Sequence, residues 1–268
     1  MLDRILANKR REIQVLRARP AALPSPRQSV DVARALRRDR GMPLRLIAEV
    51  KLRSPSAGSL SRVMSPAERA FAYAEAGAAM ISVLCDTAFF DGSWDDLALA
   101  RRQLGGPWSA VPLLAKEFVL DERQVEEARA RGADAVLLIA RIVTRDRLVE
   151  LTRAAHEIGI EPVLEVVDEE ELDRALAAGA RVIGVNARDL DTLKMDAARA
   201  ARVMDRVPPS IVAIHFSGLR EPADVQRVAS GRASAALIGE ALMRDEDPRP
   251  RLRAMVAAAE AATPNASP

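Results

Sequence analysis

The sequence predicts an α/β fold, a closed (β/α)8 TIM barrel with an N-terminal helical extension, on three observations. The 268 residues match the length that such a barrel uses in a single domain. From residue 45 onward, short apolar runs alternate with charged stretches that are each long enough for one helix. The runs are continuous in Val, Ile and Leu, which is typical of parallel strands buried on both faces.

The N-terminal part predicts helices that precede the barrel. Residues 2–19 place apolar side chains at roughly helical spacing between Arg and Lys residues, which indicates a helix with one apolar stripe. A connector rich in Pro and Ser follows, and then a short helix through 30–38. We therefore divide the chain into an N-terminal helical extension packed on the barrel (1–44), the barrel (45–262) and a frayed tail (263–268).

Eight apolar runs supply the expected strands. They are LIAEV (46–50), MISVL (80–84), VPLLA (111–115), AVLLIA (135–140), EPVLEV (161–166), VIGVN (182–186), IVAIHF (211–216) and AALIG (235–239). A glycine that would end a helix in the left-handed conformation precedes every second strand, at Gly77, Gly132, Gly179 and Gly231. This weak repeat favours an even-numbered barrel over an open sheet, and no GxGxxG follows the first strand.

The composition excludes several classes of protein. Forty Lys and Arg against 38 Asp and Glu give a net charge of +2, which argues against a polybasic nucleic-acid binder. One cysteine leaves no internal disulfide, and two histidines make a transition-metal site unexpected. No apolar run is long enough for a membrane span, and the charged N-terminus lacks the apolar block of a signal peptide. We therefore expect a cytoplasmic enzyme.

Charged residues at the strand ends are the first candidates for chemistry, because reactive groups of such barrels lie there. Glu49 and Lys51 end the first strand and point to the same face, since they are two residues apart. Lys116 ends the third strand, and Glu165 lies within the fifth. Glu49, Lys51 and Glu165 are flanked by apolar residues, and Lys116 follows an apolar run, so an unpaired charge would be unfavourable at each position. We predict that they converge in the barrel mouth instead of forming a solvated rim.

Several segments, in this order, resemble the indole-3-glycerol phosphate synthase family, which makes the indole ring in tryptophan biosynthesis. They are IAEVKLRSPSAG (47–58), SVLCDTAFFDGSWDDL (82–97), PLLAKEFVLD (112–121), ADAVLLIARI (133–142), LEVVDEEELDRAL (164–176), IGVNARDLDTL (183–193) and LIGEALMR (237–244). The resemblance covers essentially the whole chain. Each motif is weak alone, and together they are highly specific.

The resemblance implies roles for five catalytic residues. Lys116 is expected to be the general acid of ring closure, and Glu165 the base of the final dehydration. Lys51 is expected to pair with the substrate carboxylate and to assist the dehydration. Glu49 and Asn186 are expected to orient the lysines and the departing hydroxyl. The reaction requires no metal and no organic cofactor.

The resemblance also implies a substrate-binding set. Its expected members are Ser54, Ser56, Phe118, Leu137, Arg188, Phe216, Ser217 and Leu237. A phosphate is expected at Gly218, Gly239 and Glu240, where such barrels bind anions through backbone N–H groups. Glu240 would contribute its amide, not its side chain. Without the resemblance, the same glycines are equally explained by tight turns.

The sequence departs from the family at the end of the seventh strand. The family usually has a glutamate at the position of Phe216, within Ser-Glu-Ser-Gly or Ala-Glu-Ser-Gly. Strand alternation turns His215 outward, so it does not replace that glutamate. The pocket would hold Lys51, Lys116 and Arg188 with one negative charge fewer than usual.

The first hypothesis is an indole-3-glycerol phosphate synthase acting on a phosphorylated small-molecule substrate, with no nucleic-acid or membrane partner. We expect a monomer or a weak homo-oligomer. One alternative is a paralogue or redesigned barrel that keeps the lysine and carboxylate pocket but acts on a related substrate. Another is a catalytically silent barrel that binds a phosphorylated ligand. Intact Lys51, Lys116 and Glu165 argue against the last, whereas Phe216 keeps the paralogue open.

Overall fold

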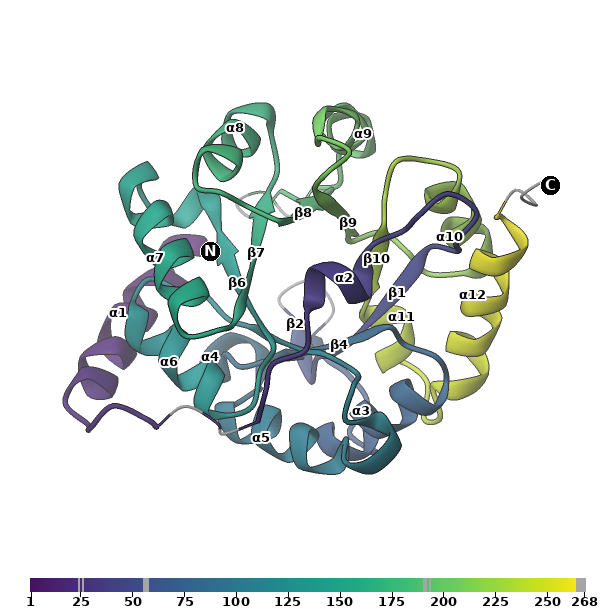
Figure 1. Cartoon of the computed structure of the whole chain (residues 1–268). Coiled ribbons are helices and arrows are strands. Elements are labelled where there is room, and N and C mark those ends of the chain that lie inside the picture. Colours follow the sequence, from purple (N-terminus) through teal and green to yellow (C-terminus); the bar gives the residue numbers. More distant parts are fainter. Residues whose placement is uncertain (24, 26, 55–57, 190–191, 193, 264–268) are drawn as a thin grey trace.

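The computed structural model describes residues 1–23, 25, 27–54, 58–189, 192 and 194–263. Within them, eight parallel strands close into a barrel in the order β1-β10-β9-β8-β7-β6-β5-β4 (Figure 1). These strands are β1 (Arg45–Val50), β4 (Met80–Leu84), β5 (Leu113–Lys116), β6 (Ala135–Ile139), β7 (Glu161–Val166), β8 (Val182–Asn186), β9 (Val212–Phe216) and β10 (Ala235–Ile238). The predicted TIM barrel is confirmed, and the largest difference from the expected strands is the later start of β5.

Helices surround the barrel on its outer face. The longer ones are α3 (Pro66–Glu75), α5 (Trp94–Gln103), α6 (Glu122–Ala130), α7 (Arg145–Glu157), α8 (Glu169–Ala177), α9 (Ala197–Arg206), α10 (Pro222–Ala229) and α12 (Arg249–Ala261). The loops hold α4 (Thr87–Phe90), α11 (Glu240–Met243), the 3-10 turns η1 (Gly106–Trp108) and η2 (Ala140–Ile142), and the hairpin of β2 (Arg53–Ser54) and β3 (Gly58–Ser59). Most of the longer helices begin with a side-chain cap, as Ser65 and Glu68 do reciprocally at α3.

Three of the four glycines of the internal repeat adopt the left-handed backbone conformation. Gly77, Gly132 and Gly179 have positive φ angles where helices end, as the sequence predicts. Gly231 does not, so that prediction is wrong at the fourth position. There Ser230 caps the end of α10 in the right-handed region, and the Gly231 N–H donates to the Val228 carbonyl, so the turn closes without a left-handed residue.

The N-terminal extension contacts both ends of the barrel. Helix α1 (Leu2–Arg17) packs beside α6 and buries Leu2 and Ile5 near the carboxyl ends of the strands. Helix α2 (Val32–Leu36) lies over the centre of the barrel in Figure 1, and its buried residues pack against the lumen. Residues 264–268 of the predicted tail lie outside the described residues. No described helix is long and apolar enough to cross a membrane.

Candidate active site

A cavity of about 600 Å³ lies at the carboxyl ends of the strands, which is a usual size for a small-molecule site. Every described residue of the predicted site lines it. These residues are Glu49, Lys51, Ser54, Lys116, Phe118, Leu137, Glu165, Asn186, Arg188, Phe216, Ser217, Gly218, Leu237, Gly239 and Glu240. Ser56 lies outside the described residues. The charges at the strand ends therefore converge in the barrel mouth, as the sequence predicts.

The first ion pair of the cavity comes from β1 and the residue after it. Lys51 Nζ lies 2.8 Å from Glu49 Oε1. The carboxylate is 2% exposed, and its other oxygen, Oε2, has no hydrogen-bond partner among the described residues. Gly239 leaves room for this side chain, because a Cβ there would lie 2.6 Å from Glu49 Oε1.

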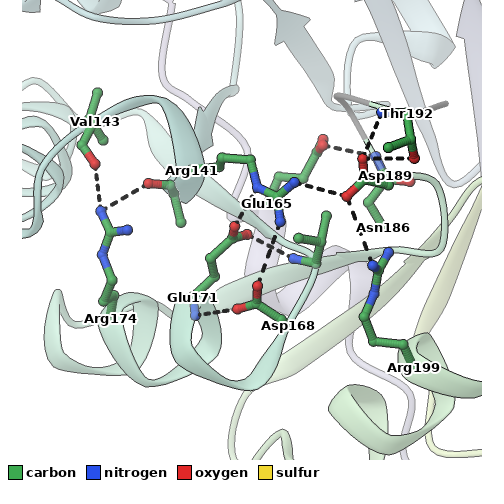
Figure 2. Close-up of polar contacts among 12 residues, drawn as sticks. Arg141, Val143, Glu165, Asp168, Glu171, Arg174, Asn186, Asp189, Thr192 and Arg199 are labelled. Atoms are coloured by element: carbon green, nitrogen blue, oxygen red, sulfur yellow. Dashed lines mark hydrogen bonds and ion pairs between the residues drawn. The ribbon is translucent and has the colours of Figure 1, made fainter. Parts of the chain in front are cut away.

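The second ion pair joins β5 and β7. Lys116 Nζ lies 3.3 Å from Glu165 Oε2. Asn186 Nδ2 donates to Glu165 Oε1 at 2.9 Å (Figure 2). The oxygen of the same amide accepts from Ser217 Oγ at 2.9 Å and from the Arg188 N–H at 3.0 Å. Two donors on Oδ1 fix the amide orientation, so its nitrogen faces the carboxylate. Glu165 is thus held between an ammonium and an amide.

Phe216 lies beneath Lys116 in the barrel lumen. Its ring is 2% exposed, and Lys116 Nζ lies 4.8 Å from the ring centroid. The neighbouring His215 does not line the cavity, and burial lowers the pKa of its imidazole. The predicted strand alternation is therefore confirmed at this point: Phe216 faces inward, and His215 faces away from the cavity.

The cavity lining also contains apolar side chains. Phe118, Leu137 and Leu237 line it, as predicted, and Phe90 packs on Phe118 with the ring centroids 6.0 Å apart. Sequence reasoning missed Phe90 and the contribution of α1, which adds Met1, Leu2 and Ile5 to the lining. These side chains offer an aromatic substrate an apolar contact area between the charged strand ends.

A buried charge cluster attaches α1 to this end of the barrel. Lys9 is 1% exposed, and its Nζ lies 2.9 Å from Glu117 Oε1 and 3.1 Å from Asp86 Oδ2. The surrounding carboxylates, which include Glu12, raise the pKa of Lys9. Burial raises the pKa of Glu117 to about 7, and the nearby Asp86 acts in the same direction. A sequence signal existed, because Lys9 is four residues from both Ile5 and Ile13 on the apolar stripe.

An arginine ties together three loops beside the cavity. Arg141, after β6, lies 2.7 Å from Glu171 Oε1 on α8 and 2.9 Å from Asp189 Oδ2 after β8 (Figure 2). Its third partner, Asp168 Oδ2, lies at 3.5 Å. Asp189 directly follows Arg188, which lines the cavity. The network therefore anchors the loop that carries Arg188, and no local motif in the sequence indicates it.

The residues predicted for phosphate lie at a basic end of the cavity. Ser217 and Gly218 both have positive φ angles, 72° and 94°, and this turn directs Ser217 Oγ to Asn186. Gly239 precedes the first turn of α11, and Glu240 pairs with Arg244 at 2.7 Å, a contact that lowers the pKa of Glu240. The described cationic residues of the lining are Lys51, Lys116, Arg188, Arg220, Arg244 and Arg251, against the carboxylates Glu49, Glu117, Glu165 and Glu240. This excess of positive charge suits an anionic ligand.

Comparisons with known proteins agree with one another. The family model described as indole-3-glycerol phosphate synthase matches residues 2–255. A relative named indole-3-glycerol phosphate synthase from Mycobacterium ulcerans (strain Agy99) is 40% identical over 96% of this chain and 94% of its own length. A relative of the same name from Mycobacteroides abscessus is 42% identical over 92% of this chain and 87% of its own length.

Solved structures support the fold. A thiamine phosphate pyrophosphorylase from Pyrococcus furiosus has a TM-score of 0.63 at 17% identity and covers 82% of this chain and 96% of its own. The 3-hexulose-6-phosphate synthase from Salmonella typhimurium has a TM-score of 0.64 at 13% identity. Its match covers 80% of this chain and 98% of its own. At these identities the likeness shows a shared barrel and nothing about chemistry. No group of three or more His, Cys, Asp or Glu side chains suited to a metal ion occurs among the described residues.

Proposed function

Because the chain belongs to the indole-3-glycerol phosphate synthase family, we propose that it closes the indole ring of 1-(2-carboxyphenylamino)-1-deoxyribulose 5-phosphate with loss of CO2 and water. This makes it a decarboxylating carbon–carbon lyase of tryptophan biosynthesis. One observation carries the proposal: the pairs Lys51–Glu49 and Lys116–Glu165 face one cavity that is also lined by aromatic and aliphatic side chains. That arrangement matches an anthranilate joined to an anionic sugar chain.

Ring closure needs a proton donor and a cation. The aromatic carbon that bears the carboxylate attacks the sugar ketone, and Lys116 donates a proton to the ketone oxygen as the carbon–carbon bond forms. Lys51 offsets the charge of the carboxylate until CO2 leaves and its electron pair restores the aromatic ring. Glu165, 3.3 Å from Lys116, pairs with the ammonium and directs it into the cavity.

Dehydration needs a base beside the departing hydroxyl. Lys51 protonates the hydroxyl, which leaves as water, and Glu165 removes a proton from the adjacent ring CH2 to complete the indole. Asn186 holds Glu165 from the other side, and the free Oε2 of Glu49 offers an acceptor for a substrate hydroxyl. Two protons leave the lysines and one reaches Glu165, so solvent returns one proton per turnover.

The phosphate is assigned to the basic end of the cavity. The backbone N–H groups of Gly218, Gly239 and Glu240 are proposed to hold it, and Arg188 supplies charge. Ser54 and Ser217 are proposed to bind sugar hydroxyls. A monomer or weak homo-oligomer is part of the same proposal. The proposal places the activity in the cytoplasm, because a substrate that carries both a carboxylate and a phosphate does not cross membranes unaided.

The proposal is tested by turnover of the substrate with and without its phosphate. Purified protein and the phosphorylated substrate are expected to give indole fluorescence, with inorganic phosphate as a competitive inhibitor. The dephosphorylated substrate should lose most of kcat/KM, because binding energy from the remote phosphate positions the reacting carbons. Equal turnover of the two substrates would remove the phosphate assignment, and absence of indole from both would contradict the proposed reaction.

A further inference from the structure

We propose that Phe216 is a positioning residue that holds the charged form of Lys116 by a cation–π contact, and that Gly184 provides the space for this ring. The effect on turnover rests on the proposed function, whereas the contact itself does not.

The contact has the geometry that this interaction requires. Lys116 Nζ lies 4.8 Å from the Phe216 centroid, inside the limit of about 6 Å at which a cation is attracted to a ring face. The ring is 2% exposed, so little water screens the attraction. Glu165 Oε2 lies 3.3 Å from the same ammonium. Lys116 is therefore held by both a carboxylate and an aromatic face.

The backbone is adapted to the ring at one residue. Gly184 of β8 is the register partner of Glu165 in β7 and of Ile214 in β9. A Cβ at Gly184 would lie 2.4 Å from Phe216 Cε2 and 2.6 Å from Cζ, distances that real Cβ atoms do not show. The ring thus occupies the volume that any other side chain at 184 would need. Phe216 and Gly184 act as a pair, and changing either moves the ring.

The consequence for Lys116 follows from charge. An aromatic face attracts an ammonium and leaves a neutral amine nearly unaffected. Unlike a carboxylate, it holds the ammonium without accepting a proton from it. Phe216 therefore keeps Lys116 charged and directed at the cavity while leaving its N–H bonds available to substrate and Glu165.

The experiment replaces Phe216 with mono-, tri- and pentafluorophenylalanine, which nearly keep the shape of the ring and progressively weaken its π face. Lys116 is then labelled at fixed pH with a limiting amine-reactive reagent, and the modified peptides are quantified by mass spectrometry. The chain has four lysines, and exposed Lys194 provides the internal reference. We expect the Lys116 rate to rise stepwise, by about three- to tenfold overall, which is the strength of a partly buried cation–π contact.

A matched series at Phe71, whose ring packs on Trp108 away from the cavity, should leave the Lys116 rate unchanged. A rate that stays constant along the Phe216 series, or that rises equally along the Phe71 series, would overturn the contact. With substrate, kcat should fall along the Phe216 series while KM stays within about twofold. Faster labelling without a change in kcat would overturn the positioning role.

A double-mutant cycle tests the pairing with Gly184 and needs no fluorinated residue. Gly184→Ala should raise the Lys116 labelling rate in the parent and add nothing in the Phe216→Leu background, because the ring is already absent. Additive effects would contradict the pairing. If the Lys116 labelling rates change as expected but the unmodified protein forms no indole, the proposed function is wrong and the cation–π contact is still supported.

Discussion

Lys116 and Glu165 meet across the barrel mouth although β6 lies between their strands, with Nζ 3.3 Å from Oε2. Both side chains extend from strand ends whose other residues are mostly buried and apolar, so each charge needs the other as its ion-pair partner. Asn186 closes the arrangement by donating to the second carboxylate oxygen at 2.9 Å. An ammonium and a carboxylate therefore face the same cavity.

Replacing Lys116 by methionine tests the acid. Lys116→Met should lower kcat by at least about 100-fold, the lower end of general-acid effects, while substrate still binds. Indole fluorescence gives kcat and KM, and thermal unfolding checks that the variant folds. Lys194→Met, on the exposed surface, serves as the control. Activity within a few-fold of the parent would remove Lys116 from the mechanism.

Gly239→Ala tests the position of Glu49. The new Cβ would lie 2.6 Å from Glu49 Oε1, so the carboxylate must move away from Lys51. A displacement of this size should lower kcat/KM by about 10- to 100-fold. Gly105→Ala is the control, because its Cβ meets its nearest atom, the Arg102 carbonyl, only at 3.6 Å. Equal loss in both variants would point to a general packing defect instead.

The raised pKa of Glu117 predicts how the free energy of unfolding depends on pH. Its pKa is about 7 in the folded protein against 4.5 for the free side chain. A raised pKa means that the folded state binds the proton more tightly, so this contribution is complete below about pH 4.5 and is lost as pH rises through 7. The free energy of unfolding should therefore decrease from pH 5 to pH 8, by on the order of 3 kcal/mol from this group.

Urea unfolding at several pH values measures this dependence. Glu117→Gln should flatten it, whereas Glu126→Gln on α6, a surface pair with Arg123, should leave it unchanged. Lys9→Met should destabilise the protein by about 3–5 kcal/mol, because two buried carboxylates lose their cation. An unchanged pH slope in Glu117→Gln would show that another group titrates.

Arg141→Met tests the anchoring of the Arg188 loop. Loss of the contacts to Glu171 and Asp189 frees this loop, so KM should rise by about tenfold with a smaller effect on kcat. Arg141→Lys should restore part of the loss, since an ammonium can pair with only one of these carboxylates at a time. Arg153→Met, on the outer surface of α7, is the control. A fall in kcat alone would contradict an anchoring role.

The sequence predicted those parts of the fold that depend on local patterns of residues. Continuous apolar runs identified the eight strands, and the charges at their ends identified Glu49, Lys51, Lys116 and Glu165. Networks between distant segments were not predictable. Arg141 and Asp189 are 48 residues apart, and each resembles any other surface charge until the barrel brings their loops together.

The N-terminal helix shows the same limit. Its apolar stripe predicted a packed face, but the stripe does not say which part of the barrel receives it. Only the structure shows that Lys9 enters that face to meet Asp86 and Glu117, and that Leu2 and Ile5 reach the cavity. Phe216 differs from these residues, because the family resemblance placed it inward and strand alternation turned its neighbour His215 outward.

One measurement tests the central claim most directly. Substrate carrying 13C in the carboxylate is incubated with the protein in a sealed vessel, and labelled CO2 and indole-3-glycerol phosphate are quantified together over time. The mechanism drawn from Lys51, Lys116 and Glu165 predicts one labelled CO2 for each indole formed, and neither product from Lys116→Met on the same timescale. Release of CO2 without indole, or formation of both products by Lys116→Met at the parent rate, would contradict it.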